Sequence, residues 1–278
     1  MSAPKSIVWL ASYPKSGNTW TRIFMANYFA NQKTPLSINQ VNKFGFGDSG
    51  ASMYSRIAGR EVDPKDKKEI LSLRPRVLSA IANNGASINY IKTHNANAVA
   101  FRDDLIPPQL TRCAIYIIRN PLDVSLSFAK HFGHTVERAV ELMSRDDFLI
   151  RATNEYATEF VGSWSGHAAS WCARSRIPVR AFRYEDMLAR PHDSFAAMLK
   201  HAGIPVDPDR LDKAVRFASF DEVSKQEEEE GFVERSENAD RFFAYGKVGR
   251  WKTELASKLA KRIRRDHRDV MKKFGYLE

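Results

Sequence analysis

The segment that most constrains the fold is a short apolar run, Ile7–Ser12, followed at once by a polar turn with Lys15, Ser16 and Gly17. From Asn18 onward, apolar residues recur at helical spacing. This pattern predicts a buried strand, a tight turn and a helix. Such a turn leaves backbone N–H groups unpaired at a helix N-terminus, and together with the helix dipole they favour a bound anion.

The same alternation continues along the chain. Three more strands are predicted at residues 88–93, 113–118 and 179–182. Helices are predicted at residues 18–31, 64–83 (with an interruption at Pro75), 122–131, 136–143, 163–175, 194–202, 209–218 and 252–274, and loops at 34–60 and 224–241. We expect one α/β domain over residues 1–278, with a central parallel sheet flanked by helices and ligands bound beyond the carboxyl ends of its strands.

Composition limits the possible partners. The formal net charge is +10, which predicts an anionic partner. The 17 Phe, 9 Tyr and 5 Trp residues exclude a disordered chain. Cys113 and Cys172 are expected to be buried thiols rather than a disulfide scaffold. No apolar run approaches the ~20 residues of a membrane span, and residues 1–5 lead straight into the first strand, so we expect a cytoplasmic protein without a membrane partner.

The chemistry of the first turn suits an anion that needs no metal. Gly17 allows the backbone to approach a ligand closely, and Lys15 adds a full positive charge. The turn differs from the Walker pattern, because its lysine precedes its only glycine. The strand at 113–118 is followed by Arg119, where a nucleotide triphosphatase would place a metal-binding carboxylate.

The octapeptide Tyr13-Pro-Lys-Ser-Gly-Asn-Thr-Trp20 resembles the 5′-phosphosulfate loop of the cytosolic sulfotransferases. The wider run from Trp9 to Trp20 is close to bacterial members that sulfate glycopeptide antibiotics. The resemblance implies a P-loop-like sulfotransferase fold and a sulfuryl donor, 3′-phosphoadenosine 5′-phosphosulfate (PAPS), which leaves as adenosine 3′,5′-bisphosphate (PAP) without a metal. The cofactor-binding residues that it implies here are Lys15, Ser16, Gly17, Asn18, Thr19 and Trp20.

Two further segments match the family in the same order. Ile91-Lys-Thr-His94 resembles the family's Lys-Thr-His, in which the histidine is the general base. His94 therefore inherits that role, which suits an imidazole, and Lys92 would stabilise the transferred sulfuryl group. Arg119 and Ser127 match the family's 3′-phosphate signature, and a guanidinium is well suited to a phosphate.

The remaining matches are weaker. Tyr184 and Phe220 match residues around the nucleotide, and Gly246 and Lys247 belong to a segment that completes the 3′-phosphate site in the family. Ala244 and Tyr245 stand where the family has Arg and Lys, and Ala218 replaces a threonine. These departures weaken the predicted hold on the 3′-phosphate, for which Lys247, Arg241 and Arg250 are the candidate substitutes. The family's dimerisation motif is not recognisable, so the oligomeric state is left open.

We predict in-line transfer of a sulfuryl group to a hydroxyl or amine of a small molecule, such as a phenolic or alcohol natural product. Candidate acceptor-lining residues are Phe44, Phe46, Phe128, His131 and Trp164. One alternative is a small-molecule kinase that uses Mg-ATP, with Glu185 or Asp186 as the metal ligand. Another is a nucleic-acid-binding module centred on the predicted helix at 252–274, although no known nucleic-acid-binding motif supports it.

Overall fold

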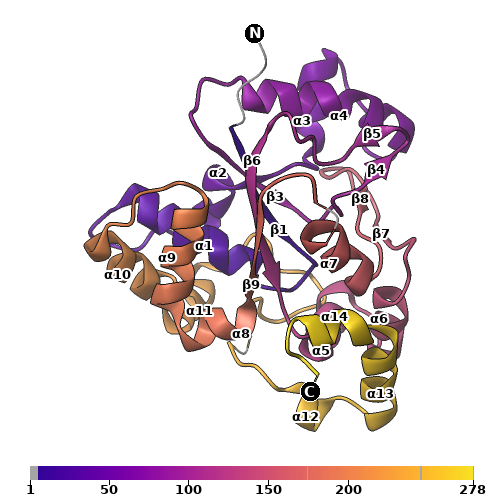
Figure 1. Cartoon of the computed structure of the whole chain (residues 1–278). Helices are drawn as coiled ribbons and strands as arrows, with labels where there is room; N and C mark the ends of the chain where they lie inside the picture. Colours follow the sequence, from indigo (N-terminus) through magenta and orange to yellow (C-terminus); the bar gives the residue numbers. More distant parts are fainter. Residues whose placement is uncertain (1–5, 174, 245, 278) are drawn as a thin grey trace.

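The computed structural model describes residues 6–173, 175–244 and 246–277 (Figure 1). Its centre is a five-stranded parallel sheet in the order β2-β3-β1-β6-β9. The strands are β1 (Ile7–Ser12), β2 (Phe46–Gly47), β3 (Asn89–Thr93), β6 (Thr111–Ile118) and β9 (Val179–Arg183). The predicted fold class and all four predicted strands are therefore confirmed, and the carboxyl ends of the strands lie along one edge of the sheet.

The sheet separates two hydrophobic cores, because side chains of a strand alternate between its faces. In β1, Ile7, Trp9 and Ala11 belong to one core and Val8 and Leu10 to the other. The first core is covered by α4 (Lys67–Ala82), α5 (Pro121–Phe132), α6 (Val136–Met143), α7 (Trp164–Cys172) and α13 (Ser257–Asp266). The second is covered by α1 (Asn18–Ala30), α9 (Pro191–His201) and α10 (Pro208–Phe217). The central strands β1 and β6 are thus buried on both faces, which explains why they read as nearly continuous apolar runs.

Several predicted boundaries were wrong. Helix α4 runs through Pro75 without a break, because its buried apolar face outweighs one missing backbone hydrogen bond. The stretch 34–60, predicted as loop, contains η1 (Ile38–Gln40), α2 (Val41–Phe44), β2 and α3 (Ala51–Ala58). The predicted loop at 224–241 begins inside α11 (Phe220–Glu230).

The carboxyl-terminal basic region is not one helix, as predicted, but three. Helix α12 (Trp251–Glu254) ends where Leu255 turns to extended backbone, and α13 gives way to α14 (Arg268–Lys273) at His267. The ring of His267 is buried against Trp164, so packing rather than charge fixes this break. In the described ranges, no helix has both the length and the apolarity needed to cross a bilayer.

The smaller elements complete the rim of the sheet. Two hairpin-like pairs flank it, β4 (Val99–Ala100) with β5 (Asp103–Asp104) and β7 (Leu149–Ile150) with β8 (Glu159–Phe160). Helix α8 (Tyr184–Ala189) follows β9 directly. Of these, β8 and the start of α8 lie at the carboxyl edge of the sheet, where the site described below is formed.

Candidate functional site

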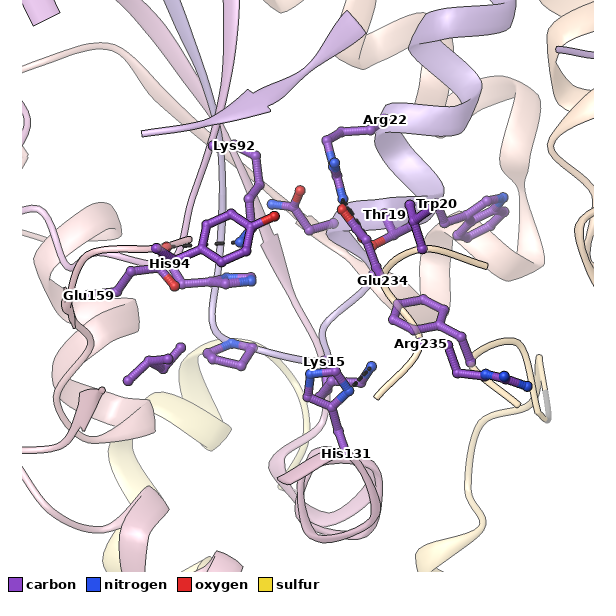
Figure 2. Close-up of a pocket in the computed structure, with 18 of the residues that line it drawn as sticks. Lys15, Thr19, Trp20, Arg22, Lys92, His94, His131, Glu159, Glu234 and Arg235 are labelled. Carbon is purple, nitrogen blue, oxygen red and sulfur yellow. Dashed lines mark hydrogen bonds and ion pairs between the residues drawn. The ribbon is translucent and has the colours of Figure 1, made fainter. Parts of the chain in front are cut away.

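A cavity of about 1010 Å³ opens at the carboxyl edge of the central sheet (Figure 2). Four neighbouring strands deliver side chains to it: Lys15 follows β1, His94 follows β3, Arg119 follows β6 and Tyr184 follows β9. The parallel order of the strands therefore gathers residues that are far apart in the sequence, as expected for this class of sheet.

Lys15 carries its charge into the cavity from a strained turn. Its φ is 67°, in the left-handed region that side chains other than glycine rarely adopt. Its Nζ lies 3.4 Å from Nδ1 of His131 and 3.9 Å from the ring centroid of Phe242. Burial lowers the pKa of Lys15 to about 8, although the nearby Glu234 opposes that shift. Lys15 is thus a desolvated ammonium directed into the cavity.

Two glycines are required by close packing. Gly17 has a φ of 109°, and a Cβ there would lie 2.7 Å from the ring of Tyr184. A Cβ at Gly246 would lie 2.4 Å from the ring of Phe220. Trp20 packs edge-on against Tyr184 at a centroid distance of 5.7 Å and donates from Nε1 to the carbonyl of Ala218. The aromatic residues predicted around the nucleotide therefore form one wall with these two glycines.

His94 has a fixed tautomer. Its Nδ1 lies 2.8 Å from the backbone oxygen of Ser12, and a carbonyl can only accept, so Nδ1 carries the proton and donates it. Nε2 then keeps its lone pair. Burial, followed by the charge of Lys92, holds the pKa of His94 well below its usual range. The ring is therefore neutral near pH 7 and able to accept a proton.

A second histidine, missed by the sequence analysis, supports the first. Nε2 of His167 lies 3.1 Å from the backbone oxygen of His94, and its Nδ1 lies 2.9 Å from the hydroxyl of Tyr116. Because the carbonyl must accept, Nε2 carries the proton and Nδ1 accepts from Tyr116. Burial lowers the pKa of His167 to about 4, so this ring also stays neutral and holds the main chain of His94 in place.

Asp48, also missed, anchors the residues on either side of His94. Its Oδ2 accepts from Oγ1 of Thr93 at 2.9 Å and from Nδ2 of Asn95 at 3.1 Å. The same carboxylate forms a buried ion pair with Arg74 of α4. A single carboxylate therefore ties the end of β3 to α4 and sets the direction in which His94 leaves the strand.

Glu234 places an anionic oxygen on the predicted phosphosulfate loop (Figure 2). Its carboxylate accepts from Oγ1 of Thr19 at 2.9 Å and pairs with the buried guanidinium of Arg22 at 2.7 Å. The loop thus already binds a negatively charged group of the chain itself. Two buried groups nearby, Oγ of Ser16 and Nε of Arg119, have no hydrogen-bond partner within the described residues. Of these two donors, Arg119 lines the cavity and fits a cofactor that carries several anionic oxygens.

Arg119 and Asp123 organise the other end of the cavity. Arg119 donates to the backbone oxygens of Lys15 and Lys247, and its guanidinium stacks 4.5 Å from the ring centroid of Tyr184. Asp123 accepts from the backbone N–H groups of Gly249 and Trp251. It therefore holds the carboxyl-terminal segment against α5.

Most of the predicted site residues meet in this cavity. Lining it are Lys15, Gly17, Asn18, Thr19, Trp20, Lys92, His94, Arg119, Ser127, Tyr184, Phe220 and Gly246, whereas Ser16 and Lys247 do not line it. The side chain of Lys247 is exposed, and Arg241 pairs with Glu228, while Arg250 lines the cavity. Tyr245 lies outside the described residues.

The predicted acceptor residues divide into two groups. Phe46 and His131 line the cavity. Phe128 and Trp164 are fully buried core residues, and Phe44 stacks on Phe29 and Tyr90.

The acidic pair that a kinase would need is engaged elsewhere. Oε1 of Glu185 accepts from the backbone N–H of Asn120 at 2.9 Å, and its Oε2 accepts from the hydroxyl of Tyr276 at 2.9 Å. Asp186 lies 3.8 Å from Arg183. Over the part of the chain that the structure describes, no group of three or more His, Cys, Asp or Glu side chains is arranged to hold a metal ion. These contacts disfavour the kinase alternative.

Comparison with known proteins places the chain among sulfotransferases. A family model described as a sulfotransferase domain matches residues 5–275. Flavonol 3-sulfotransferase of Flaveria bidentis is 25% identical, covering 92% of this chain and 78% of that protein. Amine sulfotransferase of Oryctolagus cuniculus is 23% identical, covering 96% and 81%. Among solved structures, retinol dehydratase with androsterone and inactive cofactor PAP has a TM-score of 0.65 at 17% identity, covering 97% of this chain and 81% of that one.

Proposed function

Because the chain belongs to the sulfotransferase domain family, we propose that it transfers a sulfuryl group from PAPS to a hydroxyl or amine of a small molecule. The observation that carries this proposal is the set of groups gathered in one cavity. Three cations, Lys15, Lys92 and Arg119, surround it together with the neutral imidazole of His94. Such a site suits an anionic donor and a nucleophile that must lose a proton.

Each of these residues has a distinct task. PAPS supplies an activated sulfuryl group, whose bond to the bridging oxygen breaks as a bond from sulfur to the acceptor forms. Nε2 of His94 takes the acceptor's proton. Lys15 neutralises charge on the phosphate side, and Lys92 stabilises the sulfuryl oxygens. As in phosphoryl transfer, positioning and charge stabilisation provide most of the rate.

The nucleotide is bound by the residues around the loop after β1. Thr19 and the turn around Gly17 hold the 5′ end, Trp20, Tyr184 and Phe220 enclose the base, and Arg119 and Ser127 bind the 3′-phosphate. Arg250 is the best placed substitute for the family's missing cations, because it lines the same cavity as Ser127, although its guanidinium also pairs with Glu254.

The acceptor is a small molecule with a hydroxyl or an amine. One relative is named for a flavonol, a second for an amine, and a structural neighbour holds androsterone. These three molecules share neither a charge nor a ring system, so the names do not narrow the acceptor further. Phe46, Met53 and Ile150 give the cavity apolar wall area that suits a phenol or a hydrophobic alcohol. We also infer a reducing, cytoplasmic setting, because Cys113 and Cys172 are free thiols.

Thermal unfolding with three nucleotides tests the cofactor. PAP, 5′-ADP and ATP with magnesium are added separately. Each is used at about 100 times its dissociation constant or, if that cannot be reached, at the highest soluble concentration. A ligand at that excess adds about 2.7 kcal/mol to the free energy of unfolding. We expect a clear shift with PAP and a smaller one with 5′-ADP. A shift confined to ATP with magnesium would support a kinase, and no shift with any nucleotide would contradict the proposal.

A further inference from the structure

Glu159 is a buried carboxylate in the wall of the cavity, beside the reacting groups (Figure 2). Its side chain is 7% exposed. Its Oε1 has no hydrogen-bond partner anywhere in the described chain. The nearest cation, Nζ of Lys92, lies 3.9 Å away, which is too far for a hydrogen bond. A buried carboxyl oxygen in this position is unfavourable unless something else donates to it.

The backbone holds this carboxylate in place. Glu159 pairs with Ile150 across β7 and β8. The next residue, Phe160, donates its backbone N–H to Oδ1 of Asn95 at 2.7 Å and accepts from the backbone N–H of Ala96 at 2.7 Å. Burial raises the pKa of the Glu159 carboxyl, and the main chain of His94 is among the nearby groups that oppose this rise. Glu159 is therefore fixed to the same segment that carries His94.

A counter-ion role for Lys92 does not account for this arrangement. Nζ of Lys92 stands beyond hydrogen-bond reach of Oε1, so the ion pair leaves that oxygen without a donor. The remaining source of a donor is the molecule that enters the cavity. Because Glu159 and His94 are fixed to each other, that donor must lie close to the group that His94 deprotonates.

We propose that Glu159 is a specificity-determining residue that accepts a hydrogen bond from a second donor on the acceptor, adjacent to the reacting hydroxyl. The class of acceptor is a compound with two neighbouring donors, either two hydroxyls or a hydroxyl and an ammonium group. A charge-assisted hydrogen bond would join that second donor to Oε1. This inference rests on the proposed sulfuryl transfer and adds the chemical class of its acceptor.

Three matched acceptors test the proposal. Catechol carries a neighbouring hydroxyl, 2-(aminomethyl)phenol carries an ammonium group, and 2-methoxyphenol has no second donor. The value of kcat/KM is measured for each with PAPS, in the wild type and in Glu159→Gln. The matched control is Glu155→Gln, which removes the same charge from an exposed position on the rim of the same cavity.

We expect the wild type to prefer a two-donor acceptor over 2-methoxyphenol. In Glu159→Gln, the ratio of kcat/KM values for that pair should fall by about tenfold or more, the worth of a hydrogen bond to a charged group. In Glu155→Gln the ratio should stay as in the wild type. Whether catechol or 2-(aminomethyl)phenol loses more identifies the donor as a hydroxyl or an ammonium group.

Other results would overturn the inference. An equal loss of kcat/KM with all three acceptors would mean that Glu159 serves only to place Lys92, and a wild type that prefers 2-methoxyphenol would exclude a second donor. If Glu159→Gln does not fold, as judged by its thermal shift with PAP, Glu159→Asp is used instead. Its shorter side chain moves the carboxylate away from the acceptor, so the ratio of kcat/KM values should still fall. Absence of transfer to every acceptor by the folded wild type would instead contradict the proposed function.

Discussion

Lys15 and His94 share one cavity and both are buried, but they differ in charge near pH 7 because an ammonium starts from a much higher pKa than an imidazole. Desolvation lowers the pKa of each group. For His94, burial and the charge of Lys92 hold the pKa well below its usual range, so the ring is neutral near pH 7 and can accept a proton. For Lys15 the pKa stays near 8, so the ammonium is still mostly charged at pH 7. Burial therefore acts in the same direction on both groups, and the difference between their ordinary pKa values leaves one a proton acceptor and the other a cation.

The pKa of Lys15 predicts how nucleotide affinity depends on pH. An anionic ligand binds the protonated ammonium, and above pH 8 the free protein has lost that proton. Binding must then take up a proton, so the dissociation constant of PAP should rise toward tenfold per pH unit between about pH 8 and 10 and stay nearly flat from 6 to 7.5. His131 does not contribute there, because burial lowers its pKa to about 3. Isothermal titration at several pH values measures this.

Lys15→Arg is the matched variant for that measurement. A guanidinium keeps its charge throughout this range, so the rise above pH 8 should disappear. The same rise in Lys15→Arg as in the wild type would assign the effect to another group.

At the scale of elements, the segment from Gly231 to Phe243 lies over the loop after β1. Glu234 reaches from it to Thr19 and Arg22, and Phe242 lies against Lys15. The segment therefore presents a carboxylate to the same hydroxyl that is predicted to bind the cofactor. A bound nucleotide must compete with Glu234 for Thr19.

Glu234→Gln should accordingly tighten the binding of PAP. The variant removes a negative charge near the anion site and weakens the contact that the nucleotide displaces, so we expect the dissociation constant to fall by about threefold to tenfold. Glu237→Gln removes an exposed charge from the same segment and serves as the control. Weaker binding in Glu234→Gln would show that this carboxylate supports the nucleotide site instead.

Arg250 is the proposed replacement for the cations that the sequence lacks in this segment. It lines the cavity, as Ser127 does, and pairs with Glu254, whereas Lys247 is exposed. Arg250→Ala should raise the dissociation constant of PAP by about tenfold and leave that of 5′-AMP nearly unchanged, because only PAP carries the 3′-phosphate. Lys247→Ala should change neither dissociation constant. Equal losses of PAP and 5′-AMP affinity in Arg250→Ala would indicate a general structural defect.

The elements differ in how far the sequence predicts them. Strands β1 and β6 were predicted correctly because a strand buried on both faces reads as an apolar run, while β3 and β9 are shorter runs with polar residues between the apolar ones. Helix α11 was missed although Ser219 and Glu222 carry a capping signal, and the backbone N–H of Glu222 does bond to Oγ of Ser219 at 3.3 Å. The short helices α2 and α3 have no such signal, because tertiary contacts rather than local propensity stabilise them.

At the scale of the whole molecule, the sequence likewise predicts only those site residues that have a local signal. Lys15 and Arg119 follow apolar runs and His94 follows a predicted strand, so the sequence alone could place all three at strand ends. Asp48 and Glu159 have no local signal, since their partners lie far along the chain. Only the folded sheet, which places β2 and β3 side by side and β8 against the end of β3, brings these two acids to His94.

The buried position of Asp48 also predicts that its loss destabilises the whole fold. Its ion pair with Arg74 is buried and joins the sheet to α4, so Asp48→Ala leaves an uncompensated charge. We expect the free energy of unfolding to fall by about 3–5 kcal/mol in urea denaturation. Asp104→Ala breaks a pair with the exposed Arg176 and should cost less than about 1 kcal/mol. Similar losses in the two variants would mean that the Asp48 network adds little to stability.

The central claim is that His94 removes a proton during sulfuryl transfer, and it is tested most directly by one comparison. Transfer of radiolabelled sulfur from PAPS to catechol and to 2-methoxyphenol is measured for the wild type and for His94→Ala. We predict that kcat falls by about 10²–10⁴-fold in His94→Ala, while the dissociation constant of PAP changes by less than about twofold. Near-normal turnover in His94→Ala would contradict the account.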